Sequence, residues 1–118
     1  METNKIIIQD SDLDTANAIR SLLSQVGYTV MTIKTLSALE SLIVKFKPNL
    51  LIIECIVGDN EAKRLLSDLK KNFNIKVIAT HCGNNRSYLI ENIGFNDCLT
   101  KPFNIDDVQQ VIRRQLAA

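Results

Sequence analysis

The stretch NLLIIE at residues 49–54 decides the fold class of this chain. It contains four consecutive apolar residues and ends in Glu54. A second run of this kind, KIIIQ at residues 5–9, is followed directly by Asp10. Short apolar runs that contain β-branched residues are typical of strands buried on both faces of a parallel sheet. We therefore predict two central parallel strands, each with an acidic residue at its carboxyl end.

Signals for helix starts and ends separate these two strands. Ser11 and Asp14 have the spacing of a capping box for a first helix, which closes on Gly27. Thr35 is the predicted N-cap of a second helix, and Pro48 prevents that helix from continuing. The sequence therefore places one helix after the first strand and another before the strand that ends at Glu54.

The remaining elements continue this alternation. Further strands are predicted at residues 28–33, 76–80 and 97–100. Further helices are predicted from the apolar spacing of residues 62–73, at residues 85–93 before Gly94, and after Asn104, which forms a capping box with Asp107. Five strands that alternate with five helices predict an α/β, doubly wound fold, because right-handed crossovers cover both faces of a parallel sheet.

Length and charge limit the classes of protein that fit this sequence. A chain of 118 residues fits a single domain, residues 1–118. The net charge is +1 and no stretch gathers basic residues into a stripe, so we expect no direct nucleic-acid binding. The apolar runs are far shorter than the roughly 20 residues that cross a bilayer, and no secretory signal is visible. We expect a cytoplasmic protein without a membrane contact.

The three cysteines do not indicate a metal site or a disulfide framework. They are an odd number and lack a CxxC spacing. We therefore interpret Cys55, Cys82 and Cys98 as structural thiols.

Polar residues gather where the predicted strands end. Asp10 and Ser11 follow the first strand, Glu54 ends the third, Thr80 and His81 lie at the end of the fourth, and Lys101 follows the fifth. In doubly wound sheets, ligands bind at the carboxyl ends of the strands. This edge of the sheet is therefore the predicted site.

Three segments resemble the signatures of response-regulator receiver domains, the phosphoacceptor modules of two-component signalling. These segments are QDSDLD at residues 9–14, PNLLIIE at residues 48–54 and LTKPF at residues 99–103. The resemblance extends over essentially the whole chain. It implies a flavodoxin-like five-stranded sheet, (βα)5, with strand order 2-1-3-4-5. It also implies a signalling module that is not an enzyme.

The resemblance assigns a role to each residue at the strand ends. Glu54 lies where the family has its phosphorylated aspartate, and Lys101 matches the lysine that binds the phosphoryl group. Asp10 matches the first acid of the magnesium site, together with Glu54 and the carbonyl of Ile56. Thr80 is the preferred match for the family's switch hydroxyl, with His81 as the alternative because the end of this strand is uncertain by one residue. Cys98 lies where receivers often carry an aromatic switch residue.

Two departures from the family pattern affect the chemistry. Glu54 is longer than aspartate by one methylene, which displaces its carboxylate by about 1.5 Å. Ser11 replaces the second acid of the pair, so we expect the binding of Mg²⁺ to be weakened. The longer Glu54 side chain is also able to reach Lys101 and form a permanent ion pair. We therefore predict a receiver whose phosphorylation site is degenerate and which acts through protein-protein interaction.

Two other functions remain as alternatives. One is a receiver that a histidine kinase still phosphorylates with the help of magnesium. The other is a flavodoxin-like binder of a nucleotide or flavin, but the acidic loop after the first strand would repel a phosphate group. The expected partners are a histidine kinase, an output domain or a second copy of the chain, which would bind through the fourth helix, the fifth strand and the fifth helix.

Overall fold

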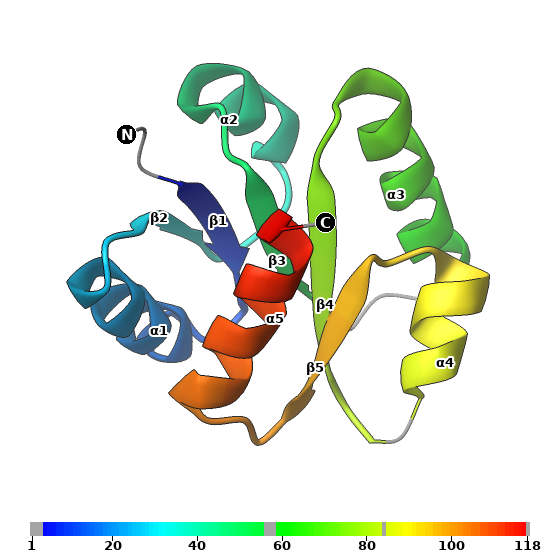
Figure 1. The fold of residues 1–118 in the computed structure, drawn as a ribbon. Coiled ribbons are helices and arrows are strands. Elements are labelled where there is room, and N and C mark those ends of the chain that lie inside the picture. Colours follow the sequence, from blue (N-terminus) through cyan, green and yellow to red (C-terminus); the bar gives the residue numbers. More distant parts are fainter. Residues whose placement is uncertain (1–3, 56–58, 84, 118) are drawn as a thin grey trace.

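Five parallel strands form a single sheet in the order β2-β1-β3-β4-β5 (Figure 1). The computed structural model describes residues 4–55, 59–83 and 85–117. The strands are β1 (Lys5–Gln9), β2 (Thr29–Ile33), β3 (Leu50–Glu54), β4 (Lys76–Cys82) and β5 (Asp97–Lys101). The predicted flavodoxin-like, doubly wound α/β fold and its strand order are confirmed.

Helices cover both faces of this sheet. They are α1 (Leu13–Gln25), α2 (Leu39–Phe46), α3 (Asp59–Asn72), α4 (Arg86–Tyr88), its π-helical continuation η1 (Leu89–Ile93) and α5 (Ile105–Ala117). Helices α1 and α5 pack on one face, whereas α2, α3 and η1 pack on the other. No helix in the described ranges is both long and apolar enough to cross a membrane.

The two apolar runs that predicted the fold are the centre of the core. Alternate side chains of a strand point to opposite faces, so Ile6 and Ile8 pack toward α1 and α5, and Ile7 packs toward the other helices. Strand β3 divides its side chains in the same way, and Leu51 is fully buried. Burial of each such side chain stabilises the fold by about 1.5–3 kcal/mol, which explains why β1 and β3 lie next to each other at the middle of the sheet.

The predicted capping box of Ser11 and Asp14 is not formed, and Thr35 is not the cap of the second helix. The N-cap of α1 is Asp12, whose carboxylate accepts hydrogen bonds from the Asp14 backbone N–H and the Thr15 hydroxyl. Helix α2 begins at Leu39, because the Thr35 hydroxyl pairs with the Ser37 hydroxyl and does not cap a backbone N–H. In both cases a neighbouring side chain competes with the predicted cap.

The later helix signals agree better with the structure. Asn104 and Asp107 form the predicted reciprocal capping box of α5. The predicted helix at residues 85–93 has only three α-helical residues, and its remainder is η1. It ends as predicted at Gly94, whose φ of 109° lies in the left-handed region that favours glycine.

Candidate functional site

The carboxyl ends of three strands bring Asp10, Glu54 and Lys101 into direct contact. The Lys101 ammonium lies 2.8 Å from Glu54 Oε2 and 3.1 Å from Asp10 Oδ2. Lys101 and Glu54 are the last residues of β5 and β3, and Asp10 directly follows β1, the neighbour of β3 in the sheet. The ion pair that the sequence suggested between Glu54 and Lys101 is therefore present.

Backbone N–H groups bind the other oxygen of each carboxylate. The Ser11 N–H donates to Glu54 Oε1 over 3.1 Å, and the Asp12 N–H donates to Asp10 Oδ1 over 2.8 Å. Every oxygen of these two carboxylates therefore accepts at least one hydrogen bond. The arrangement holds both acids in place.

These contacts change the protonation behaviour of the pocket. Burial alone would raise the pKa of Glu54, but hydrogen bonds from Lys101 and Ser11 outweigh it and lower the pKa to about 2. Burial opposes the charge of Lys101, yet its contacts with Glu54 and Asp10 raise the pKa of the ammonium group. Two carboxylates therefore share a single ammonium, which leaves one negative charge in excess near neutral pH.

Gln9 supports this pocket from behind and was not singled out from the sequence. Its side chain is buried, accepts a hydrogen bond from the Glu54 backbone N–H over 3.1 Å, and donates to the Lys34 carbonyl over 2.9 Å. The sequence signal that could have indicated this role was a polar residue at the last position of an otherwise apolar strand. Gln9 fixes the end of β3 relative to the segment that follows β2.

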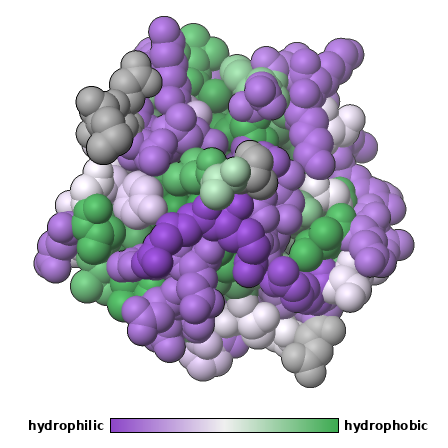
Figure 2. All heavy atoms as spheres, in the orientation of Figure 1, coloured by the Kyte–Doolittle hydropathy of each residue, from purple (hydrophilic) through white to green (hydrophobic). Residues whose placement is uncertain are grey.

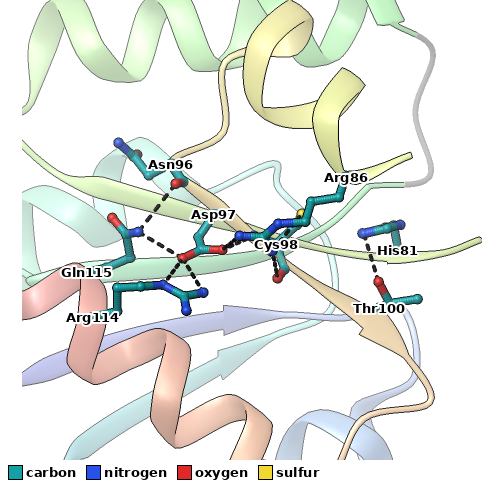
Figure 3. A network of polar contacts seen from close by, with 8 residues as sticks. All are labelled: His81, Arg86, Asn96, Asp97, Cys98, Thr100, Arg114 and Gln115. Atoms are coloured by element: carbon teal, nitrogen blue, oxygen red, sulfur yellow. Dashed lines mark hydrogen bonds and ion pairs between the residues drawn. The ribbon is translucent and has the colours of Figure 1, made fainter. Parts of the chain in front are cut away.

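A cavity of about 210 Å³ lies beside the ion pair and contains both candidates for the switch residue. Its lining includes Glu54, Thr80, His81 and Lys101. Thr80 pairs in register with Glu54, so the two side chains share a face of the sheet. The Thr80 hydroxyl and His81 Nδ1 are both buried and have no hydrogen-bond partner among the described residues. The other ring nitrogen of His81 lies 3.3 Å from the Thr100 hydroxyl (Figure 3).

Cys98, the predicted switch position, is buried in β5. Burial raises the pKa of its thiol, in agreement with a structural role. The guanidinium of Arg86 lies beside it, with Nη1 3.6 Å from Sγ and 3.2 Å from the Cys98 carbonyl oxygen. A guanidinium from α4 thus lies against the position where receivers often carry an aromatic ring.

Next to Cys98 lies a further buried carboxylate, outside the Glu54 pocket, which sequence analysis missed. Asp97 Oδ1 accepts hydrogen bonds from Arg86 and from the Cys98 backbone N–H, and Oδ2 accepts from Arg114 and Gln115 (Figure 3). We call these four side chains, Arg86, Asp97, Arg114 and Gln115, the Asp97 cluster. Burial would raise the pKa of Asp97, but the hydrogen bonds it accepts lower it. An acidic residue directly before the apolar pair Cys98 and Leu99, at the start of the predicted strand, was the signal for it.

Comparison with known proteins agrees with this fold and shows the family of the chain. The chain belongs to the response regulator receiver domain family, whose model matches residues 6–113. It is therefore a receiver domain of a two-component response regulator. It is 25% identical over 112 residues to the transcriptional regulatory protein KdpE of Staphylococcus aureus, and the match covers 93% of this chain and 48% of KdpE. The chain thus spans about half the length of this curated relative.

Solved structures confirm the fold. The N-terminal domain of the nisin resistance regulator NsrR has a TM-score of 0.82 and 21% identity, covering 96% of this chain and 97% of that one. A two-component response regulator from Clostridium difficile has a TM-score of 0.83 and 20% identity, covering 98% of this chain and 97% of that one. At such low identity, these similarities support the fold alone.

Receiver domains typically bind Mg²⁺ at their acidic pocket, but the described residues fit this ion poorly. Lys101 already occupies one oxygen of Asp10 and one of Glu54. Ser11 is exposed and offers a neutral hydroxyl. No group of three acidic, histidine or cysteine side chains in the described part of the chain is arranged to hold a metal. The predicted ligand carbonyl of Ile56 lies outside the described residues.

Proposed function

We propose that this receiver is degenerate at its phosphorylation site and acts through protein-protein interaction. The observation that carries this proposal is the 2.8 Å contact between Glu54 and Lys101. It joins the residue at the phosphoacceptor position to the lysine that would bind the oxygens of the phosphoryl group. Glu54 and Lys101 are thus already paired with each other in the absence of phosphorylation.

Charge and geometry both oppose phosphoryl transfer to Glu54. The excess negative charge of Asp10 and Glu54 repels an incoming phosphate donor. Lys101 would have to leave both carboxylates to reach the phosphoryl oxygens. The additional methylene of Glu54 also displaces the attacking oxygen, and in-line attack tolerates small displacements poorly. Weak binding of Mg²⁺ would remove the cation that usually offsets this repulsion.

The ion pair imitates only part of a phosphorylated state. A phosphorylated side chain carries about −1.5 to −2 charges and three acceptor oxygens, whereas Glu54 carries one charge and two oxygens. One of these oxygens binds Lys101 and the other binds the Ser11 N–H. The pocket therefore has a single permanent arrangement, which suits a module that presents a fixed docking surface.

The face formed by α4, β5 and α5 is the proposed docking surface. Arg86, Tyr88, Glu91, Asp106 and Arg113 are exposed on it. The outer side of α5 lies within a largely hydrophilic part of the surface (Figure 2). Mixed charges of this kind suit contact with a histidine kinase, an output domain or a second copy of the chain. They do not form the basic stripe that nucleic-acid binding requires.

A receiver that is still phosphorylated with the help of magnesium is the second candidate. The excess negative charge favours it, because a divalent cation would neutralise that charge. The Thr80 hydroxyl, which has no partner among the residues that the structure describes, is in addition an available donor at the edge of the same cavity. This candidate requires Glu54 to accept the phosphoryl group, or another residue to replace it.

Exposure to acetyl phosphate with Mg²⁺ distinguishes the two candidates. Intact mass is measured on the wild type, on Glu54→Asp combined with Ser11→Asp, and on Glu54→Gln combined with Ser11→Asp as the matched control. We expect the mass of one phosphoryl group only in the first double variant. Amide NMR with beryllofluoride and Mg²⁺ then shows whether the same variant changes conformation. Stoichiometric phosphorylation of the wild type would overturn the proposal in favour of the second candidate.

A further inference from the structure

The Asp97 cluster connects α4 and α5 through a single carboxylate. Only 2% of the Asp97 side chain is exposed, whereas Arg86 and Arg114 are each 53% exposed. Arg86 comes from the first turn of α4, and Arg114 comes from the last turn of α5. The carboxylate lies at the start of β5, between the two helices (Figure 3). The positions of both helices therefore depend on one buried group.

Helix α4 has little stability of its own. It has three α-helical residues before the π-helical turn of η1, and the side chain of its N-cap residue, Asn85, makes no capping hydrogen bond. Gly83 and Gly94 bound the segment, with φ values of 97° and 109°. Short helices without caps are unstable in isolation. Tertiary contacts must therefore hold this segment in place.

Arg86 provides the polar part of those contacts. Its guanidinium binds Asp97 Oδ1 over 2.9 Å and the Cys98 carbonyl over 3.2 Å. A planar guanidinium is able to make both bonds at once because its donors point in fixed directions. Leu89 and Ile93 contribute the apolar part, since both are buried in the core. Arg86 thus determines where the first turn of α4 lies along β5.

This position matters for the cavity beside Glu54. Asn85 and Leu89, on either side of the first turn of α4, are part of the cavity lining together with His81 and Lys101. A movement of the segment would therefore change the shape of the cavity.

We propose that Arg86 is the positioning residue that holds α4 against β5 and thereby sets the shape of this cavity. The position of α4 is then determined at Asp97 and not by the ion pair of Glu54. Cys98 is compatible with this role, because a bulky aromatic side chain there would compete with the guanidinium that lies beside its sulfur. The inference goes beyond the proposed function and holds whether or not Glu54 accepts a phosphoryl group.

Site-resolved amide hydrogen exchange of the whole chain tests this inference. The informative amides are Leu89, which donates to the Asn85 carbonyl, and Gly94, which donates to the Leu89 carbonyl. In Arg86→Ala we expect these amides to exchange at least about tenfold faster, because a charge-assisted hydrogen bond is lost. The amides of β1 and β3 should exchange as in the wild type. The ring signals of His81 should shift as the cavity changes.

Arg114→Ala is the matched control, because it removes an arginine from the same carboxylate on the side of α5. It should leave exchange in α4 unchanged, as should Glu54→Gln. Unchanged exchange at Leu89 and Gly94 in Arg86→Ala would overturn the inference, and so would an equal increase in Glu54→Gln. If Arg86→Ala does not fold, Arg86→Lys provides the same test. A single ammonium group is poorly suited to bind the Asp97 carboxylate and the Cys98 carbonyl at once, as the guanidinium does. Neither outcome depends on phosphorylation, so failure here is distinct from failure of the proposed function.

Discussion

The Glu54 pocket and the Asp97 cluster solve the same physical problem with opposite charge balance. At the carboxyl ends of the strands, Asp10 and Glu54 share Lys101. At the start of β5, the single carboxylate of Asp97 is shared by Arg86 and Arg114. Both groups of residues bury carboxylates that would be unstable without cationic partners.

The two sites differ in whether they leave space for a further ligand. The pocket has an excess negative charge, an adjoining cavity and a buried hydroxyl that has no partner among the described residues. At Asp97 both oxygens are bound by arginine, with Gln115 and a backbone N–H as further donors. The pocket therefore has space and a polar group for a further ligand, whereas the carboxylate of the Asp97 cluster is saturated and serves as a structural support.

Removal of the Asp97 carboxylate should have the largest effect. Asp97→Ala leaves two arginines and Gln115 without their shared acceptor, and we expect the free energy of unfolding to fall by about 3 kcal/mol. The half-exposed arginines are able to turn toward water, which limits the loss. Urea denaturation measures it, with the exposed Asp68→Ala as control. A loss below about 1 kcal/mol would contradict the structural role of this group.

Removal of the lysine should have a smaller but substantial effect. Lys101→Met leaves Asp10 and Glu54 close together without a cation, and we expect a loss of about 2 kcal/mol near neutral pH. The pKa of Glu54 should rise from its low value at the same time. Carboxyl carbon NMR follows that titration. A Glu54 pKa that stays low in Lys101→Met would show that the backbone donor at Ser11 alone is sufficient.

The loss of stability caused by acid at the Glu54 pocket should be smaller than the loss caused by removing Lys101. The pKa of Glu54 is lowered from 4.5 to about 2, so the ionised group stabilises the fold fully above its ordinary value. This contribution is lost as the pH falls from 4.5 toward 2, and we expect it to be about 1–2 kcal/mol between pH 5 and pH 3. Urea midpoints of the wild type and Glu54→Gln isolate it, because Asp97 titrates in both. Parallel curves for the two proteins would contradict this prediction.

Removal of the Thr80 hydroxyl, which lines the cavity, should change the free energy of unfolding least. Thr80→Val removes a buried hydroxyl that no described residue binds, and it keeps the shape of the side chain. We expect a change of less than about 1 kcal/mol, in the stabilising direction, because an unsatisfied polar group is removed. Thermal unfolding is the measurement. Clear destabilisation would mean that the hydroxyl has a partner in solution, such as an ordered water molecule.

The two sites also differ in how far the sequence predicts them. Asp10, Glu54 and Lys101 each follow or end an apolar strand, and the carboxyl ends of parallel strands meet at one edge, so their proximity follows from the fold. The partners of Asp97 lie on two different helices. Their meeting depends on how α4 and α5 rotate against β5, and a pattern of apolar residues does not determine that rotation.

The difference between features that depend on local sequence and contacts between separate elements also explains the remaining errors of the sequence-based prediction. The strand limits at residues 5–9 and the last helix cap agree with the structure, because each depends on residues that are close in sequence. The N-cap of α1 differed because Asp12 competes with Ser11 for the same role. Gln9 was missed because its contacts with Glu54 and Lys34 span separate strands. Prediction from the sequence therefore failed in two situations. In one, neighbouring residues compete for the same role, and in the other, contacts join separate elements of the fold.

The Asp97 cluster has one more consequence, which concerns the open edge of the sheet. Strand β5 is the last strand in the sheet order, and no strand in the described part of the chain pairs with its far side. The Cys98 N–H is bound by the Asp97 carboxylate, and the Cys98 carbonyl is bound by Arg86. Exposed strand edges with free backbone groups promote aggregation by strand addition. The side chains that fix α4 therefore also blunt this edge, which protects the chain against uncontrolled self-association.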